Sequence, residues 1–481
     1  MRLAPVLNIL GLLTTLLAAA MLIPMLVDLY YGSSDWQVFA MSALLTAFVG
    51  VAVWLATSQH EAFDLGLRQA FLLTNGSWIL IGVFGSLPFM FCELALSPTD
   101  AIFESVSGIT TTGSTVLERI EDASHGILIW RALLQWLGGV GIIVMAMAVL
   151  PMLSVGGMQL FRTESYDSAD KVVPRAAQLA GGIGLVYALL TAVWAAMLSF
   201  AGMSIFDAIA HAMTTIATGG YSTKTASISA FDSVAIEWII IFGMIVGSLP
   251  FAHYLAMLRG GWRPLLNDPQ VRWFLTLLAI IVGLLCWQLN ASGMSVGASI
   301  RHASFNAVSI MTGTGYGSAN FSAWGGFAST LLLISMFIGG CGGSTTCGIK
   351  VFRLQVLATT ARVQMSRLLR PHAVVLAYYN KRPVATEVLD SVMGFFYLYI
   401  LCFVLLAIML GMVGLDFITA LSGAATSISN VGPGLGDVIG ADGNFASIPD
   451  AAKWVMSFGM LLGRLEFFTV LVMLTPAFWR R

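Results

Sequence analysis

The chain has 481 residues, of which 58% are hydrophobic and only 10% are charged, and its mean hydropathy is +0.87. Soluble domains carry about 25% charged residues. The composition therefore excludes an ordinary soluble protein and predicts an integral membrane protein. The formal net charge of −1 gives no reason to expect a nucleic-acid partner.

Ten apolar stretches reach the roughly 20 residues that a helix needs to cross a ~30 Å hydrocarbon core. They lie near residues 4–27, 38–57, 71–91, 127–150, 178–201, 234–258, 271–290, 327–352, 389–413 and 451–476. No barrel-like alternation competes with them. We therefore expect an all-α integral membrane protein with about ten transmembrane helices. The first stretch is too long for a signal-peptide core and is interpreted as a retained span.

The Lys and Arg residues set the orientation. Counted over the connections, 17 lie on the side of the N-terminus, five lie on the opposite side, and Arg464 lies within a span. Because basic residues stay on the cytoplasmic side, both termini are predicted to be cytoplasmic. The five cysteines sit in or beside apolar runs, so we interpret them as buried thiols rather than as a disulfide framework.

Four of the outer connections share one pattern, a short amphipathic stretch followed by a glycine-rich tail. They read FESVSGITTTG (103–113), IAHAMTTIATG (209–219), FNAVSIMTGTG (305–315) and SGAATSISNVG (422–432). The pattern indicates an internal repeat of span, short segment, glycine turn and span. We place the four repeats at 61–165, 166–262, 263–385 and 386–481, after two extra spans in 1–60.

A ten-residue helix covers only about 15 Å, so each short segment enters the membrane without crossing it. Irregular backbone survives at membrane depth only where protein or water surrounds it. Any one segment alone is equally well a polar surface loop, but four in register predict convergence on one axis. Turns made by glycine allow backbone carbonyls to point toward a common axis, and Ser and Thr add hydroxyl oxygens. Together these oxygens suit a small monovalent cation. The four tails contain no Lys or Arg.

The stretch TGTGYGS, residues 312–318, resembles the TVGYG filter of potassium channels. The four non-identical units resemble those of the Trk/Ktr/HKT superfamily of cation transporters. Within it, the segments similar to the four filters of the bacterial TrkH branch are GITTTGST (108–115), ATGGYST (217–223), TGTGYGSAN (312–320) and SNVGPGLG (429–436). The resemblance spans essentially the entire chain, including the two extra N-terminal spans.

This resemblance implies K⁺ uptake across a bacterial inner membrane by a protein that is not an enzyme and has no covalent cofactor. The implied filter residues are Thr111, Thr112, Gly113, Thr218, Gly219, Thr314, Gly315, Tyr316, Asn430, Val431 and Gly432, with K⁺ held at Thr112, Thr218, Thr314 and Val431. Only the third tail keeps a full GYG, which leaves the K⁺ to Na⁺ ratio open, with Rb⁺ and Na⁺ as lesser substrates. The alternative is a Na⁺-permeable protein or an ion-coupled secondary symporter of the same architecture.

A second glycine-rich stretch, GGCGGSTTCGIK (339–350), interrupts the eighth span. Each glycine costs a helix about 1 kcal/mol relative to alanine, so the helix must break here. A packing kink and a flexible loop that blocks the ion path both fit this composition. The resemblance favours a gating loop, whose residues are Gly339, Gly340, Gly342, Gly343, Ser344, Thr345, Thr346 and Gly348.

Arg464 is the one basic residue deep within a span. It lies 11 residues from Lys453 and 16 from Arg480, which is about 16 to 24 Å of helix. An intramembrane Arg normally faces protein or water and has a partner. Glu466, two positions away, would face another side of the helix. The resemblance implies that Arg464 holds the glycine loop closed through loop carbonyls.

The sequence contains no nucleotide-binding motif and no cytosolic stretch large enough for a regulatory domain. The basic segment 353–382 either reflects the positive-inside rule or docks a cytosolic protein. The resemblance implies a TrkA-type cytosolic regulatory subunit that binds ATP/ADP or NAD(H), and a homodimer in the lipid bilayer. We find no cluster of residues with catalytic spacing.

Overall fold

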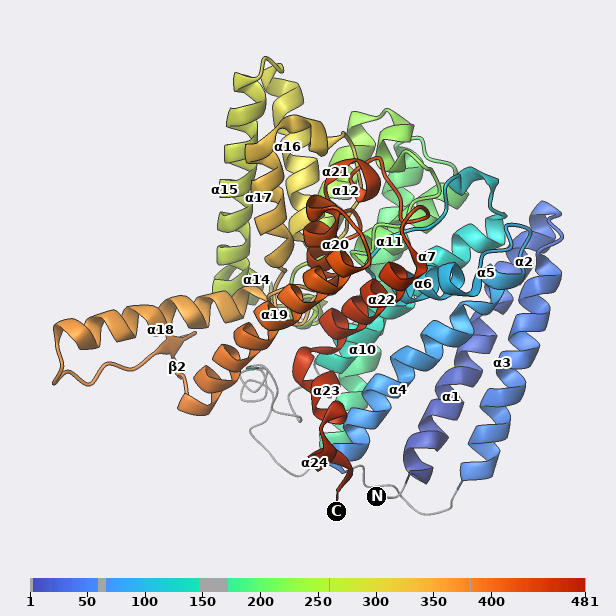
Figure 1. Cartoon of the computed structure of the whole chain (residues 1–481), viewed down its shortest axis with the longest axis horizontal. Coiled ribbons are helices and arrows are strands. Elements are labelled where there is room, and N and C mark those ends of the chain that lie inside the picture. Colours follow the sequence, from blue (N-terminus) through green and yellow to red (C-terminus); the bar gives the residue numbers. More distant parts are fainter. Residues whose placement is uncertain are drawn as a thin grey trace.

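The computed structural model describes residues 3–58, 66–146, 157, 172–258, 260–380 and 382–480, without the side chains of 172–179 and 382. Helices dominate this part of the chain (Figure 1). The only strands found in it are β1 (Tyr378–Tyr379) and β2 (Arg382–Pro383), which pair as a two-residue antiparallel hairpin. The prediction of an all-α membrane protein is confirmed.

Seven described helical segments are long and apolar enough to cross a membrane. They are α1 with α2 (Ala4–Ala20 and Leu22–Tyr31), α3 (Trp36–Thr57), α4 with α5 (Leu67–Gly85 and Leu87–Phe91), α7 (His125–Val144), residues 180–200 of α10 (Val172–Phe200), α15 (Pro269–Ala291) and α19 (Thr386–Met412). The predicted boundaries after residues 60 and 165 lie outside the described residues. Those before 263 and 386 directly precede α14 (Arg263–Asn267) and α19.

Three of the ten predicted spans are not straight helices. The stretch 234–258 divides into α12 (Val234–Gly247) and α13 (Phe251–Leu258), bent by 94°. The stretch 451–476 divides into α22 (Asp450–Leu465), α23 (Phe467–Leu471) and a 3₁₀ turn, bent by 113°. The stretch 327–352 gives only the 12-residue α17 (Gly326–Phe337) before the glycine loop. Proline and glycine remove or weaken helical hydrogen bonding, which explains the first and third breaks.

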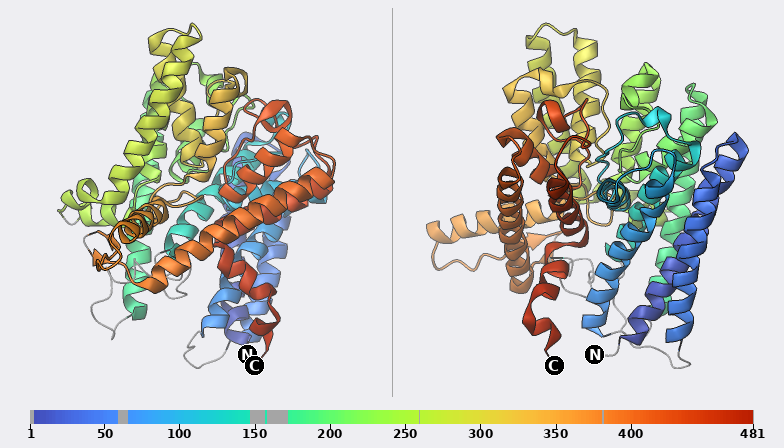
Figure 2. Two further views of the ribbon diagram at one scale, coloured as in Figure 1. Left: turned by 60° about the vertical axis from the view of Figure 1, so that its left-hand side comes forward. Right: turned by 45° about the vertical axis from the view of Figure 1, so that its right-hand side comes forward.

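The remaining helices are short or lie at the edge of the bundle. Their bounds are η1 (Ile120–Asp122), η3 (Ser227–Phe231), η4 (Phe321–Trp324), α18 (Val351–Leu369), α21 (Gly436–Ile439), η5 (Val472–Leu474) and α24 (Pro476–Trp479). α18 projects sideways from the bundle in Figure 1 and in the right-hand view of Figure 2. α1 begins and α24 ends at the same end of the molecule (Figure 1).

The four short amphipathic segments form helices. They are α6 (Pro98–Ile109), α11 (Ile205–Ile216), α16 (Val296–Met311) and α20 (Phe417–Ser429). Each begins at a capping side chain: Ser97, Ser204 and Ser295 accept a bond from the amide three residues on, and Asp416 accepts two amides. Such caps satisfy amides that the first helical turn leaves unpaired. The helices can therefore start sharply at a fixed residue.

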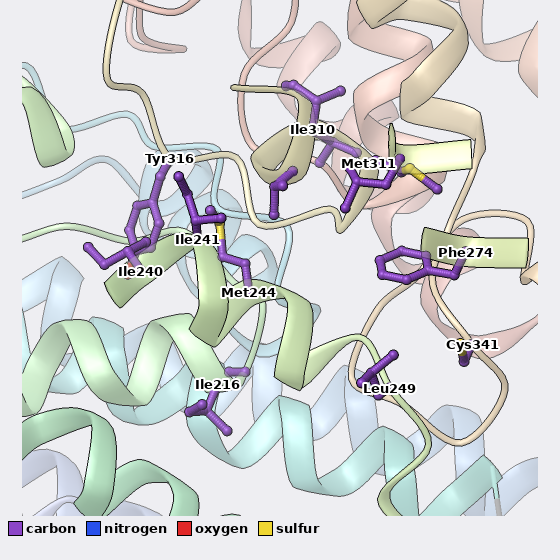
Figure 3. Packing of buried hydrophobic residues seen from close by; sticks show 14 of the residues in the cluster. Ile216, Ile240, Ile241, Met244, Leu249, Phe274, Ile310, Met311, Tyr316 and Cys341 are labelled. Carbon is purple, nitrogen blue, oxygen red and sulfur yellow. The ribbon is translucent and has the colours of Figure 1, made fainter. Parts of the chain in front are cut away.

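A buried apolar cluster supports two of these short helices from behind (Figure 3). Ile216 at the end of α11 and Met311 at the end of α16 belong to it. Met244 of α12, Phe274 of α15 and Cys341 of the glycine loop belong to the same cluster. Close-packed interiors yield little to small displacements. The ends of the short helices and the glycine loop are therefore held by one continuous core.

Candidate ion-conducting site

The backbone after each short helix passes through an unusual left-handed residue, and in three of the four segments a left-handed glycine follows. We call residues 110–114, 217–221, 312–317 and 429–434 the first to fourth filter segments. Their second residues all have left-handed φ values: Thr111 56°, Thr218 50°, Gly313 73° and Asn430 52°. Two residues later, Gly113, Gly220 and Gly315 are left-handed again, at 87°, 81° and 82°. Non-glycine residues rarely adopt this region, and their strain marks sites that the surroundings over-determine.

This conformation corrects the predicted register of the second segment. Gly220, and not Gly219, aligns with Gly113, Gly315 and Gly432. Gly219 instead takes the place of Thr112: the amide of each bonds to the carbonyl five residues earlier, at 2.8 Å and 2.9 Å. Thr218 accordingly aligns with Thr111. The sequence ATGGYST holds two adjacent glycines, and composition alone does not decide between them.

The four segments meet in a closed ring. A Cβ built on Gly315 would lie 2.6 Å from the amide nitrogen of Gly432, and one on Gly432 would lie 3.3 Å from the carbonyl oxygen of Gly113. A Cβ on Gly113 would clash with the carbonyl of Gly219, and one on Gly220 with that of Thr314. Each segment therefore touches the next, from the first to the fourth and back. Glycine is required because backbone approaches backbone.

One cavity opens onto this ring. Its lining includes all four aligned glycines, Gly113, Gly220, Gly315 and Gly432. Two basic residues, Arg131 and Lys224, also line it, although none lies in the filter segments themselves. The four glycines thus share one water-accessible space, as the corrected register requires.

Several carbonyl oxygens of the ring accept no hydrogen bond from the described part of the protein. Those of Thr112, Thr218, Thr314 and Val431 are among them. The four residues are at most 2% exposed. Buried carbonyls are nearly always paired with protein or ordered water. These oxygens therefore need a partner that the described part of the protein does not supply.

Side chains behind the ring fix its other polar groups. Gln135 of α7 donates from Nε2 to the carbonyl of Gly219 at 2.6 Å and accepts from the amide of Tyr221 at 3.0 Å. Asn430 donates to Thr112 Oγ1 at 2.9 Å. The Tyr316 hydroxyl lies 2.5 Å from Thr214 Oγ1. Each bond joins two different repeats, so the segments hold one another in place.

A buried ion pair behind the first two segments escaped sequence analysis. Arg131 Nε lies 2.7 Å from Glu104 Oε1, and both side chains are at most 1% exposed. The guanidinium also donates to the carbonyl of Ser222 at 2.9 Å and lies 4.0 Å above the ring of Tyr221. The signal in the sequence was a carboxylate within a short intramembrane helix, because ionisable groups at such depth are expensive.

Replacing Glu104 with alanine is expected to destabilise the protein, since it leaves the Arg131 charge buried and unpaired. Breaking a buried pair in this way costs about 3–5 kcal/mol. Thermal unfolding of the purified variant, followed by tryptophan fluorescence in detergent, measures the effect. Glu118→Ala removes an exposed carboxylate nearby and serves as the control. Equal midpoints for both variants would contradict the structural role of the pair.

The outer loops of the first two repeats are also tied together. Thr225 donates its amide to Glu121 Oε1 at 2.9 Å, and its hydroxyl oxygen accepts from the amide of Ile120 at 3.0 Å. Partial burial raises the pKa of Glu121, but the hydrogen bonds from Thr225 outweigh it and the pKa is lowered. The ionised carboxylate therefore stabilises this rim above its unfolded pKa, and the contribution is lost as the pH falls through the folded pKa.

The predicted break in the eighth span is present, and it forms a buried loop between α17 and α18. Its base is closed by the amide of Gly339 bonded to the carbonyl of Ile349 at 2.9 Å. Gly343 and Gly348 have left-handed φ values of 76° and 70°. The other predicted loop residues, Gly340, Gly342, Ser344, Thr345 and Thr346, all lie within this loop.

The loop fits into the break between α12 and α13. The amides of Cys341 and Thr345 donate to the carbonyls of Ser248 and Gly247 at 3.0 and 3.2 Å. The hydroxyl of Thr345 accepts from Thr218 Oγ1 at 3.0 Å. The glycine loop of one repeat therefore lies directly against the filter segment of another.

Arg464 contacts this loop. Its Nη1 donates to the carbonyl of Thr345 at 3.0 Å and lies 2.6 Å from Cys347 Sγ, and its Nη2 donates to the carbonyl of Gly138 at 2.8 Å. The side chain is 1% exposed. The contacts with Cys347 and Gly138 were not expected from sequence. The role of Arg464 as the holder of the loop stays a prediction.

Comparison with known proteins connects this geometry to a family. A family model described as TrkH, cation transport protein, matches residues 35–481. The Trk system potassium uptake protein TrkI of Halomonas elongata is 44% identical over 100% of this chain and 98% of that protein. TrkH of Escherichia coli K12 is 40% identical over 98% of each chain. The chain belongs to the TrkH family.

The likeness extends to three dimensions. The crystal structure of the potassium transporter TrkH from Vibrio parahaemolyticus superposes with a TM-score of 0.92 at 37% identity, covering 100% of both chains. The filter ring and the glycine loop therefore lie on a fold shared over the whole length. Membership of the TrkH family places the chain among membrane cation transporters rather than enzymes.

Proposed function

We propose that this chain takes up K⁺ across the bacterial inner membrane through the filter ring. The relatives are named as potassium uptake proteins. The observation that carries the proposal is the set of buried, unpaired carbonyl oxygens at three equivalent positions of the ring, Thr112, Thr314 and Val431. The equivalent carbonyl of the second segment, that of Gly219, accepts from Gln135. A ring of such oxygens replaces the hydration shell of a monovalent cation. These three residues belong to the four K⁺ positions predicted from the sequence, whereas the fourth, Thr218, lies one residue earlier in the structural register, where Gly219 takes its place.

The surroundings favour a cation over an anion. All four short helices end at the ring, and the C-terminal end of a helix carries about half a negative charge. Glu104 compensates the charge of Arg131 at the outer cavity. The filter segments themselves contribute only neutral atoms. An anion path would instead need basic groups on the axis.

The glycine loop is the proposed gate. It lies against the second filter segment through Thr345, and Arg464 holds it there. In this arrangement the loop blocks the path, and its displacement opens the path. We further propose a homodimer whose opening is controlled by a TrkA-type cytosolic subunit that binds ATP/ADP or NAD(H). The projecting α18 and its basic residues support such a docking site.

A second candidate is a Na⁺-permeable protein or an ion-coupled symporter of the same architecture. The residues after the four aligned glycines differ, being Ser114, Tyr221, Tyr316 and Pro433. Fewer equivalent oxygen sites reduce discrimination between cations. Competition between Na⁺ and the transported ion distinguishes this candidate from a K⁺-selective path, and dependence on a second solute gradient reveals a symporter.

The test is ⁸⁶Rb⁺ uptake into liposomes that contain the purified protein, with Na⁺ as competitor, for the native chain and Gly315→Ser. Gly315 has a φ of 82°, and its Cβ would press on Gly432. We expect native uptake that is lost or made unselective in the variant. Gly293→Ser is the matched control, because Gly293 has a φ of 93° and no atom within 4 Å of an added Cβ. Equal, selective uptake by Gly315→Ser would refute the filter assignment.

A further inference from the structure

The break between α22 and α23 lies at a strained residue that the proposed ion path does not use. Glu466 has φ 66° and ψ 128°, a conformation that residues other than glycine rarely adopt. The two helices bend by 113° here. No glycine or proline sits at the break itself. A strained conformation persists only where surrounding contacts determine it.

A buried arginine from another repeat supplies the contact. Arg353 Nη2 lies 2.7 Å from Glu466 Oε2, and the two side chains are 1% and 9% exposed. The guanidinium also lies 3.7 Å above the ring of Phe395. Removing one partner of such a pair leaves a buried charge without compensation. The pair therefore fixes the carboxylate of Glu466 and, through it, the bend.

One member of the pair lies beside the residue that contacts the proposed gate, and the other lies beside the C-terminal end of the gate. Glu466 follows Arg464, the residue that contacts the loop, by two positions. Arg353 stands near the start of α18, which begins at Val351 as the chain leaves the loop. Lys350, just before that helix, donates to the carbonyl of Thr346 within the loop. The pair thus joins the segment that leaves the loop to the segment that carries Arg464.

We propose that the Arg353–Glu466 ion pair is a positioning element of the gate, which sets where Arg464 lies and couples movement of α18 to it. This inference rests on the proposed gating role of the loop. When the pair is intact, the bend at Glu466 aims Arg464 at Thr345 and Cys347. When α18 moves or the pair is broken, the bend relaxes and Arg464 leaves the loop, which opens the path.

A purely structural pair and a positioning pair give opposite results. Loss of a structural pair lowers the uptake per folded protein or leaves it unchanged. Loss of a positioning pair raises uptake, because the closed state loses its holder. The substitution Glu466→Gln preserves the size of the side chain and removes the charge, so it separates these outcomes.

The experiment compares ⁸⁶Rb⁺ uptake by liposomes containing the native chain, Glu466→Gln, Arg464→Ala and the double variant, each verified as monodisperse. We expect Glu466→Gln to raise uptake roughly fivefold or more. A fivefold rise corresponds to a shift of about RT ln 5 in the free-energy difference between the closed and open states. Adding Glu466→Gln to Arg464→Ala should raise uptake by less than Glu466→Gln raises it in the native chain, because both substitutions act through the contact of Arg464 with the loop. Glu237→Gln is the control, since it neutralises another nearly buried carboxylate whose partner is Arg301.

The outcomes separate the two proposals. If Arg464→Ala raises uptake and Glu466→Gln does not, the positioning role of the ion pair is refuted and the gating role of the loop is supported. If neither raises uptake, the gating role of the loop falls as well. If Glu466→Gln is not monodisperse, the neutral double variant Arg353→Gln/Glu466→Gln replaces it, because it removes the pair without leaving a buried charge. Uptake above the native level is again expected there, and native uptake would overturn the inference.

Discussion

Replacing Arg464 with alanine is expected to raise Rb⁺ flux through the purified protein by about tenfold or more, in the absence of any partner subunit. The substitution removes bonds to Thr345, Cys347 and Gly138 together. Hydrogen bonds that involve a charged group contribute about 1.5–3 kcal/mol each. The remaining backbone bonds of the loop do not reach α22, so the closed position loses its link to that helix. Uptake of ⁸⁶Rb⁺ into liposomes measures the effect.

Two further variants make this prediction specific. Arg464→Lys keeps the charge but lacks the planar fork that reaches several acceptors, so an intermediate flux is expected. Phe458→Ala, a change at a side chain of the same helix that is 44% exposed, should leave flux unchanged. Unchanged or lost flux for Arg464→Ala in a correctly folded protein would count against the loop as a gate.

Substitution of Gly220 by alanine is expected to abolish uptake, at a loss of about 100-fold or more, whereas Gly219→Ala retains a measurable fraction. Gly220 has a φ of 81°, and its Cβ would collide with the backbone carbonyl of Thr314 across the ring. Gly219 has no left-handed φ, and its Cβ would meet the side chain of Gln135. A side chain moves more easily than a backbone inside the ring. The same liposome assay ranks the two variants.

Gly202→Ala isolates the cost of a left-handed φ. Gly202 has a φ of 106° in a connection, and nothing lies within 4 Å of an added Cβ. Its uptake should match the native level, apart from a small change in yield. If Gly219→Ala were the inactive variant and Gly220→Ala the active one, the register expected from the sequence would be restored and the structural alignment would be wrong.

Membrane physics made much of the fold predictable from the sequence. The hydrocarbon core admits few structures, so apolar length alone predicts spans. The short helices were visible because FESVSGITTTG and its three counterparts are too short to cross and too polar to face lipid. Five glycines between 339 and 348 predicted the break in the eighth span. Nothing comparable marked the break at Glu466, where neither glycine nor proline stands.

The site was predicted less completely because its register depends on three-dimensional contacts. The adjacent glycines Gly219 and Gly220 are equivalent in sequence, and only the alternating backbone conformation distinguishes them. Arg464 was recognised as an anomaly, since a charge so deep requires a partner. Its partner Cys347 lies 117 positions away. No periodicity along a single helix reports a contact at that separation.

By itself, the sequence determined that this protein lies in a membrane, that it is helical, that four short segments converge, and that the eighth span breaks at a glycine loop, because each follows from local composition against a ~30 Å apolar slab. The tertiary structure alone decided which groups meet: Glu104 with Arg131 behind the ring, Gln135 with Gly219, and Arg353 with Glu466 beside the glycine loop. The physical reason is that buried charges and amides need partners wherever the fold supplies them. The sequence shows only that such a need exists.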